Sequence, residues 1–260
     1  MHTQSSLIKD IEKIGVNKEG TLLIHSSMKA IGEVDGRGDT VIDAFIDYMK
    51  EGLLLFPTHT WSEDNLKDGI YNPKTEPSCV GLLTNLFRKR QGTTRSMHPS
   101  HSVTAMGKRA KEYTDRDDQF ENYTPCPTGG CFDGLYDEDA QILFFGVPLT
   151  RNTYIHVIEE KLDIPNRINN KARDIKMIYE NGDVRETKLY GHFSTLGDVS
   201  QNYGKLLKPM LEMGMAKEGK IGDATSYLVK VRPMSDWVTK MLKDDPDLFS
   251  DNNEIENYLI

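Results

Sequence analysis

The chain has 260 residues, a formal net charge of −8, and 37% hydrophobic and 28% charged residues. This composition is typical of a soluble globular protein, and the length allows a sizeable core. The acidic balance argues against binding to the phosphate backbone of nucleic acids, which favours a basic face. No apolar run approaches the roughly 20 residues that a membrane-spanning helix needs, and the N-terminus lacks the pattern of a signal peptide. We therefore expect a cytoplasmic protein with no nucleic-acid or membrane partner.

Patterns in the N-terminal half of the sequence predict alternating helices and strands. Apolar residues at helical spacing, followed by Gly15, predict an amphipathic helix over residues 4–15. Further on, a glycine-rich loop leads to a helix that Asp39 is expected to cap. The polar stretch over residues 59–77 lacks a sustained period and is expected to run irregularly over the site. The other expected elements are strands at 21–25, 53–58 and 102–106, helices at 40–50 and 80–90, and a polar stretch at 108–130.

The C-terminal half adds a different pattern. Asn181-Gly182 stands between two strand-like arms over residues 175–190, which is the strongest short-range signal of an antiparallel hairpin. The other expected elements are strands at 142–147 and 226–231 and helices at 153–162, 199–213 and 234–242. Without repeats or linker-like segments, we expect one α/β domain over residues 1–260, a layered mixed sheet flanked by helices with the hairpin added.

Polar side chains cluster beside three buried-looking segments. His25 ends the first strand, His98 and His101 precede a strand at 102–106, and His156 lies on a helix that follows the strand at 142–147. Open α/β sheets bind ligands at the carboxyl ends of their strands. His25 and His156 are therefore expected to belong to one site.

The loop over residues 26–38 offers hydroxyl groups and glycines ahead of a helix. These features suit a pyrophosphate group, but they also suit an ordinary turn between a strand and a helix. The spacing matches neither the Walker motif nor the Gly-x-Gly-x-x-Gly fingerprint of dinucleotide-binding proteins. Both interpretations of the loop stay open.

His156 has two candidate carboxylate partners, because Glu159 and Glu160 lie three and four residues further along the same predicted helix. A carboxylate bonded to one ring nitrogen fixes the tautomer and makes the other nitrogen a better base. A surface His-Glu pair without a catalytic role is the alternative.

A metal site is not expected. His98 and His101 flank Pro99, but no third ligand with suitable spacing is apparent. The three cysteines, Cys79, Cys126 and Cys131, are odd in number and lack a Cys-x-x-Cys pair, so we expect idle thiols.

Taken together, these segments resemble the aminoglycoside 3-N-acetyltransferase family over about residues 21–245. The segments that carry the resemblance are Leu23 to Ser27 with Gly32, Arg95 with His98 to Ser102, Leu143 to Val147, Asn152-Thr153 with His156 and Glu159, and Ile221 to Ala224. The family commonly has a Ser-Pro pair where Cys131-Phe132 stands here, and Cys131 could be mistaken for a nucleophile.

The resemblance implies an enzyme that moves the acetyl group of acetyl-CoA to an amine. In the family this amine is the 3-amino group of the 2-deoxystreptamine ring of an aminoglycoside antibiotic, and the reaction confers resistance. By resemblance His156 is the general base, Glu159 supports it and His25 belongs to the same catalytic cluster. The residues expected to line the coenzyme are Ser26, Ser27, Met28, Lys29, Ser102 and Val103.

A polycationic acceptor calls for acidic residues, and three stretches could line its cleft: Glu63-Asp64, Asp115 to Asp118 with Glu121, and Asp133 to Asp139. A related acetyltransferase for another amino sugar or small amine is the main alternative. Less favoured are a non-catalytic binding protein and a Ser-His hydrolase with Ser26, Ser27 or Ser102 as nucleophile, which lacks the Gly-x-Ser-x-Gly elbow. The oligomeric state stays open, with a homodimer as one alternative.

Overall fold

The computed structural model describes residues 1–256 and 258, and it is built on a seven-stranded sheet in the order β4-β5-β2-β1-β6-β10-β9. β1 runs parallel to β2 and β6, and the other neighbouring pairs of this sheet are antiparallel. The predicted fold class, a mixed sheet flanked by helices, is confirmed. The strands are β1 Thr21–Ser26, β2 Leu53–Pro57, β4 Thr94–Arg95, β5 Val103–Gly107, β6 Gln141–Phe145, β9 Ala216–Ile221 and β10 Ala224–Lys230.

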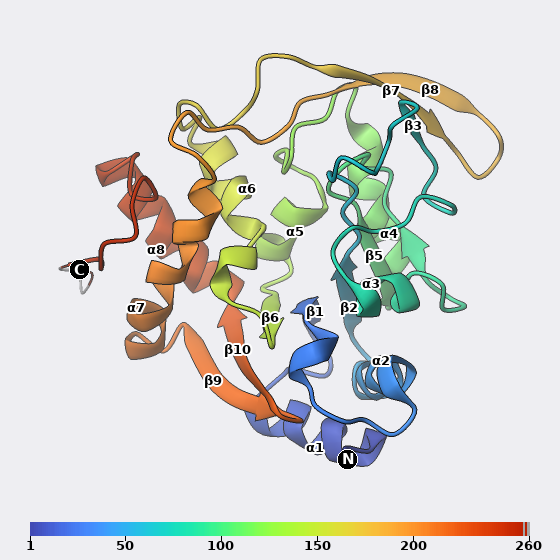
Figure 1. Ribbon diagram of the computed structural model, residues 1–260, viewed down its shortest axis with the longest axis vertical. Helices are drawn as coiled ribbons and strands as arrows, with labels where there is room; N and C mark the ends of the chain where they lie inside the picture. Colours follow the sequence, from blue (N-terminus) through green and yellow to red (C-terminus); the bar gives the residue numbers. More distant parts are fainter. Residues whose placement is uncertain (257, 259–260) are drawn as a thin grey trace.

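Two apolar layers cover the two faces of this sheet (Figure 1). Successive residues of a strand point to opposite faces, so Leu22 and Ile24 of β1 pack in one core and Leu23 packs in the other. α1 Gln4–Ile14, α2 Arg37–Tyr48 and α3 Leu82–Phe87 supply the first layer. The second layer contains α4 Ala110–Thr114, α5 Cys131–Asp137, α6 Tyr154–Lys161, α7 Leu207–Glu212 and α8 Val231–Asp244.

The predicted hairpin is present and forms a second, three-stranded sheet with a short strand from the polar stretch at 59–77. Its strands are β3 Ile70–Tyr71, β7 Arg173–Ile178 and β8 Val184–Leu189, and they enclose a small core of their own. In Figure 1 the hairpin lies at the top right, and its two connecting segments cross the top of the molecule. The hairpin therefore brings distant segments of the chain to one end of the large sheet.

Several predicted elements differ from the observed ones. The second helix begins at Arg37, because Gly36 adopts a φ of 74° and turns the chain earlier than expected. The prediction that Asp39 caps this helix is wrong, since its carboxylate lies in the first turn and binds Arg90 at 2.9 Å. The helix expected at 199–213 divides into a 3-10 helix, η4 Val199–Leu206, and α7, because Pro209 has no N–H donor and suits a first helical turn.

The elements that were not predicted include α4 and α5 within and after the polar stretch at 108–130, the two-residue strands β3 and β4, and the edge strand β9. Lys217, Glu218 and Lys220 make β9 too polar for a sequence pattern to show it. Charged residues are common on edge strands because they prevent pairing with other chains.

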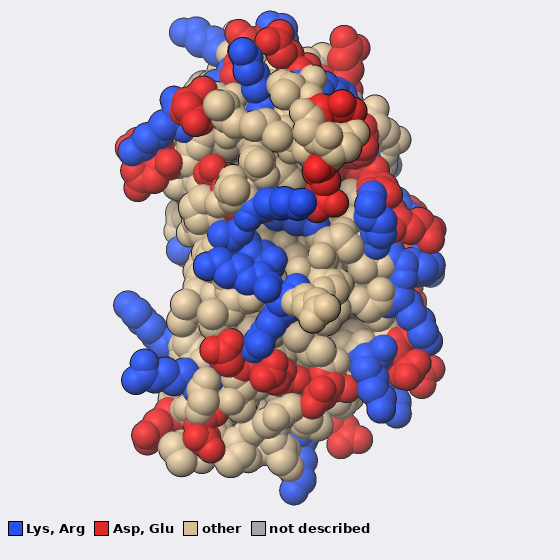
Figure 2. All heavy atoms as spheres, turned by 90° about the vertical axis from the view of Figure 1, so that its right-hand side faces the viewer, with Lys and Arg blue, Asp and Glu red and all other residues tan. Residues whose placement is uncertain are grey.

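The surface charge is unevenly spread. On the face shown in Figure 2, Lys and Arg side chains gather in the middle, with Asp and Glu side chains above and below them. Among residues 1–256 and 258, no helix combines the length and the apolar character that crossing a membrane requires.

Replacing Gly107 with alanine should destabilise the fold. Gly107 has a φ of +109°, and an added Cβ would lie 2.3 Å from the carbonyl oxygen of Gly52 on the neighbouring strand end. Gly92 is the matched control, because it has a φ of +86° with nothing within 4 Å of an added Cβ. Backbone strain should cost each variant about 1–2 kcal/mol, and the clash should cost Gly107→Ala ~1–3 kcal/mol more. Urea unfolding midpoints measure the difference, and equal losses in the two variants would contradict the packing described here.

Candidate active site

A cavity of about 920 Å³ lies where β1 and β2 end. Its lining includes His25 and Ser26 from the end of β1 and Pro57 from the end of β2. Of the seven histidines in the chain, five line it: His25, His59, His101, His156 and His192. The expected site at the carboxyl ends of the strands is therefore a real cavity, and it joins His25 to His156.

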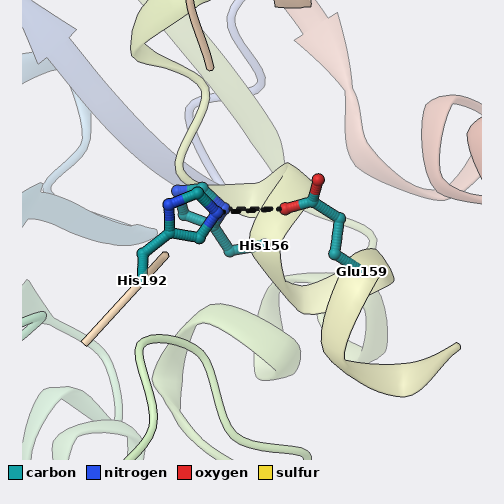
Figure 3. A group of neighbouring side chains, drawn as sticks. All are labelled: His156, Glu159 and His192. Carbon is teal, nitrogen blue, oxygen red and sulfur yellow. Dashed lines mark hydrogen bonds and ion pairs between the residues drawn. The ribbon is translucent and has the colours of Figure 1, made fainter. Parts of the chain in front are cut away.

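His156 is bonded to Glu159 within this cavity. Its Nδ1 lies 2.9 Å from Oε2 of Glu159, one helical turn further along α6 (Figure 3). Because the carboxylate accepts a hydrogen bond at Nδ1, the neutral imidazole carries its proton there and leaves Nε2 as a free base. Burial lowers the pKa of His156 and outweighs the opposite effect of Glu159, so the ring is neutral at pH 7.

Glu159 is buried and fully engaged. Arg167 Nε donates to its Oε1 at 2.8 Å, and the Tyr203 hydroxyl donates to its Oε2 at 3.0 Å. Burial by itself would raise the pKa of this carboxyl group, but contact with His156 and His192 holds the pKa below its usual value. The carboxylate is therefore charged and rigidly placed beside the imidazole.

The structure decides which carboxylate faces His156. Glu160 turns away from it and accepts hydrogen bonds from the Thr124 hydroxyl at 2.5 Å and the Cys126 N–H at 2.6 Å. Burial raises the pKa of Glu160 to about 7. Glu160 therefore anchors the loop around Thr124, and Glu159 is the partner of His156.

His192 and His59 were missed by the sequence patterns. The His192 ring lies 4.1 Å from that of His156, and its Nε2 lies 3.7 Å from Oε2 of Glu159, beyond hydrogen-bonding distance (Figure 3). His192 follows β8 with no motif around it. His59 comes just after the end of β2, and His25 lies at the end of β1, so the similar positions were the signal available. The Nδ1 of His59 accepts from Trp61 Nε1 at 3.1 Å.

In the part of the chain that the structure describes, His156, Glu159 and His192 are the group that could hold a metal ion. However, Glu159 already accepts bonds from His156, Arg167 and Tyr203, and the Nδ1 of His156 is committed to one of them. A metal ion would have to break this arrangement beside a buried guanidinium group. The donor set fits a hydrogen-bonded base better than a metal centre.

His25 is buried and stacks on Phe144 with ring centroids 5.4 Å apart. Burial and the positive charge of Arg151 lower the pKa of His25 to about 3, so this ring is neutral. Ser26 lines the same cavity. Ser27, Met28 and Lys29 are not part of the lining, and they form the start of the 3-10 helix η1 Met28–Ala30.

Ser102 and Val103 do not line the cavity, since Ser102 is fully buried and Val103 is 1% exposed. The Ser102 hydroxyl donates to the Thr58 carbonyl at 2.7 Å and accepts from Arg95 Nε at 3.0 Å. These contacts link the chain just after β2 to the chain just before β5. They do not suit the nucleophile of a Ser-His hydrolase, which needs a histidine partner.

His98 and His101 have separate environments. His98 accepts the backbone N–H groups of Ser100 and His101 at Nδ1, and its Nε2 lies 2.8 Å from the Thr124 carbonyl oxygen. His98 is therefore satisfied structurally. His101 alone of the two lines the cavity.

Two of the three cysteines are buried, and all three are free. Burial raises the pKa of the Cys131 thiol far above its usual value. Its backbone N–H donates to Asp117 at 2.8 Å at the start of α5, which fits a structural position. Cys79 lines the edge of the cavity.

The prediction that acidic stretches line the cavity is wrong for the described residues. Asp117 and Asp133 are buried in internal contacts, the former with Cys131 and the latter with Gly129 and Lys161. Those residues satisfy buried backbone groups instead of facing a ligand. The charged residues in the cavity lining are Arg151, Lys171, Arg173 and Asp198.

Comparison with known proteins agrees with this geometry. A sequence model of the aminoglycoside 3-N-acetyltransferase family matches residues 23–243. An SPbeta prophage-derived aminoglycoside N(3')-acetyltransferase-like protein of Bacillus subtilis is 26% identical, with 92% of this chain and 91% of the relative covered. Aminoglycoside N(3)-acetyltransferase III of Salmonella sp is 25% identical, with 88% and 87% covered.

The solved structure of AAC-IIIb in its binary form with CoASH has the same fold. Its TM-score is 0.79 at 21% identity, with 94% of this chain and 97% of that chain covered. The match of the family model over most of the sequence shows that this chain belongs to the aminoglycoside 3-N-acetyltransferase family.

Proposed function

We propose that this chain transfers the acetyl group of acetyl-CoA to an amine of an aminoglycoside, the 3-amino group of the 2-deoxystreptamine ring, and so confers resistance. His156 is the general base in this proposal and Glu159 is its supporting carboxylate. The observation that carries it is the 2.9 Å bond between His156 Nδ1 and Glu159 in a cavity of about 920 Å³. A cytoplasmic location fits because acetyl-CoA is a cytoplasmic metabolite.

The arrangement supplies the proton transfer that the reaction needs. An amine attacks a thioester only after it has lost its extra proton, and Nε2 of His156 is free to accept a proton. The nitrogen lone pair then forms the new bond to the carbonyl carbon, whose π electrons move to oxygen, while the nitrogen gives up an N–H proton to Nε2. The oxyanion then re-forms the C=O bond. When the C–S bond breaks, sulfur leaves with the electron pair and takes up a proton. Glu159 stabilises the imidazolium ion that exists between these transfers.

The cavity has the size and charge for the coenzyme. Small-molecule sites commonly measure about 300–1,000 Å³, so this cavity lies near the upper end. Arg151 lies close enough to His25 to lower its pKa, which puts a cation beside the end of β1 for the coenzyme phosphates. We place the coenzyme at this end, against Ser26 and the segment Ser27 to Lys29, with His25 nearby and with Ser102 and Val103 acting only as buried support.

Coenzyme A should stabilise the protein against heat. A ligand at 100 times its dissociation constant adds about 2.7 kcal/mol to the free energy of unfolding, which corresponds to a shift of roughly 5–10 °C for a protein of this size. Arg151→Gln should reduce the shift, and Lys108→Gln, at an exposed position outside the cavity, should keep it. No shift at saturating coenzyme A would contradict the proposal.

Replacing His156 with alanine or asparagine should lower kcat on the order of 10² to 10⁴, the usual contribution of a general base. Coenzyme A binding, measured by calorimetry, should remain. In the wild type, kcat should persist as the pH falls through 6.5 and decline only below it, because burial lowers the pKa of His156 and the protonated ring cannot accept a proton.

Two carboxylate variants are the matched controls for this experiment. Glu159 raises the pKa of His156, so Glu159→Gln should lower kcat and move the acid limb of the rate profile to lower pH. Glu160→Gln changes a carboxylate that does not contact the ring, and its acid limb should stay in place. Wild-type kcat in the His156 variants, or a shifted limb only in Glu160→Gln, would remove the assigned roles.

The protein should release free thiol from acetyl-CoA when kanamycin is supplied as the acceptor. Asp198 is the acidic residue of the described cavity lining, and it lies close enough to His156 to raise its pKa. Asp198→Asn should therefore raise the KM for kanamycin, and higher ionic strength should raise it in the wild type by screening the charges. Kinetics of thiol release measure both effects, and no release with kanamycin would contradict the aminoglycoside as acceptor.

A further inference from the structure

The cavity has two charged ends. Arg151 and Ser26 lie at the end of β1, where the coenzyme is proposed to bind. Lys171 precedes β7 and Arg173 is its first residue, and this part of the chain pairs with the part that leads from β8 to His192. The Asn169 N–H donates to the Gly191 carbonyl at 2.9 Å, which fixes the two segments side by side. Because the His192 ring contacts that of His156, the second end adjoins the base.

Within the described residues, neither of the two cations at this end forms an ion pair with a carboxylate. Asp174, the acidic residue next to Arg173 in the sequence, pairs with Lys188 at 3.3 Å instead. One guanidinium nitrogen of Arg173 donates to the Leu66 carbonyl at 2.9 Å, which holds the side chain in place while other N–H groups stay available. Lys171 is exposed, and no carboxylate within the described residues forms an ion pair with it.

The cavity lining that contains the base also contains an acidic residue. Asp198 lines the same cavity as His156, and its negative charge raises the pKa of His156. The carboxylate of Glu159 is already compensated by Arg167. The described lining around the base therefore presents one anion, Asp198, and two cations, Lys171 and Arg173.

These charges complement a small zwitterion. An ammonium group is attracted to Asp198 in the lining, and a phosphate group is attracted to Lys171 and Arg173. Hydroxyl groups of a sugar find partners in the polar lining, which includes Asn169 and Ser200.

We propose that this enzyme also acetylates a second class of acceptor, amino sugars that carry a phosphate group, with Lys171 and Arg173 as the phosphate-binding residues. The reaction at nitrogen is the same as for an aminoglycoside: the amine lone pair forms the N–C bond, the thioester C–S bond breaks, and the amine proton reaches sulfur through His156. The inference rests on the proposed acetyltransfer function and adds a substrate class to it.

The test compares glucosamine with glucosamine 1-phosphate and glucosamine 6-phosphate, which differ from it only in the phosphate. Thiol release from acetyl-CoA should show at least a tenfold higher kcat/KM for one of the phosphorylated sugars. Arg173→Gln and Lys171→Gln should each raise the KM for that sugar about tenfold with little change in kcat. The KM for acetyl-CoA should stay constant, because the two residues do not bind the coenzyme in this proposal.

Lys176→Gln is the matched control, since Lys176 is an exposed cation on the same strand β7 but lies outside the cavity lining. It should leave all the constants unchanged. Equal kcat/KM values for the three sugars, or no turnover of the phosphorylated ones, would overturn the inference while turnover of kanamycin still upholds the proposed function. A rise in the KM for acetyl-CoA in the two variants would assign the cations to the coenzyme instead. A wild-type protein that releases no thiol with any of these amines would overturn both proposals.

Discussion

The buried carboxylate of Glu159 is the constraint around which this end of the molecule is arranged. An ionised group that is 1% exposed is costly unless charged and hydrogen-bonding partners compensate it. Here Arg167 and Tyr203 supply that compensation from two other segments of the chain. The remaining hydrogen-bonding capacity of the carboxylate is used by His156. Removing Arg167 would leave the buried charge unpaired, and removing Tyr203 or His156 would leave a carboxylate oxygen without one of its hydrogen bonds, so the segments that carry these residues are tied together at this point.

The sheet determines where the other polar groups meet. β1, β2 and β6 are parallel, so their carboxyl ends lie at one edge, and polar residues stand at or just after the ends of β1 and β2. His25 and His59 reach the cavity for this reason, although they are distant in the sequence. This part of the site could be predicted, because short buried strands and the polar residues after them are local patterns. The spacing on the predicted helix could also narrow the carboxylate partner of His156 to two candidates, Glu159 and Glu160.

Other parts of the site depend on contacts that no local pattern reports. Tyr203 reaches Glu159 across 44 residues, and His192 meets His156 only because the hairpin folds back over the sheet. The expectation of acidic walls failed for a related reason. Whether an aspartate faces solvent, a ligand or a backbone N–H depends on tertiary structure, and Asp117 caps an interior helix end instead of a cleft. In the fold, β9 and the short helices α4 and α5 escaped prediction because their sequences are polar or brief.

The small sheet has a consequence for how this enzyme can change. It contributes the cavity wall on one side of the base, yet its three strands form a sheet separate from the large one and have their own apolar core. Substitutions in the segments around β7 and β8 can therefore reshape the side of the cavity proposed to hold the acceptor without disturbing the strand ends that carry His25 and Ser26. This separation allows substitutions to change which amine is accepted, while the part of the cavity proposed to face the acyl donor stays the same.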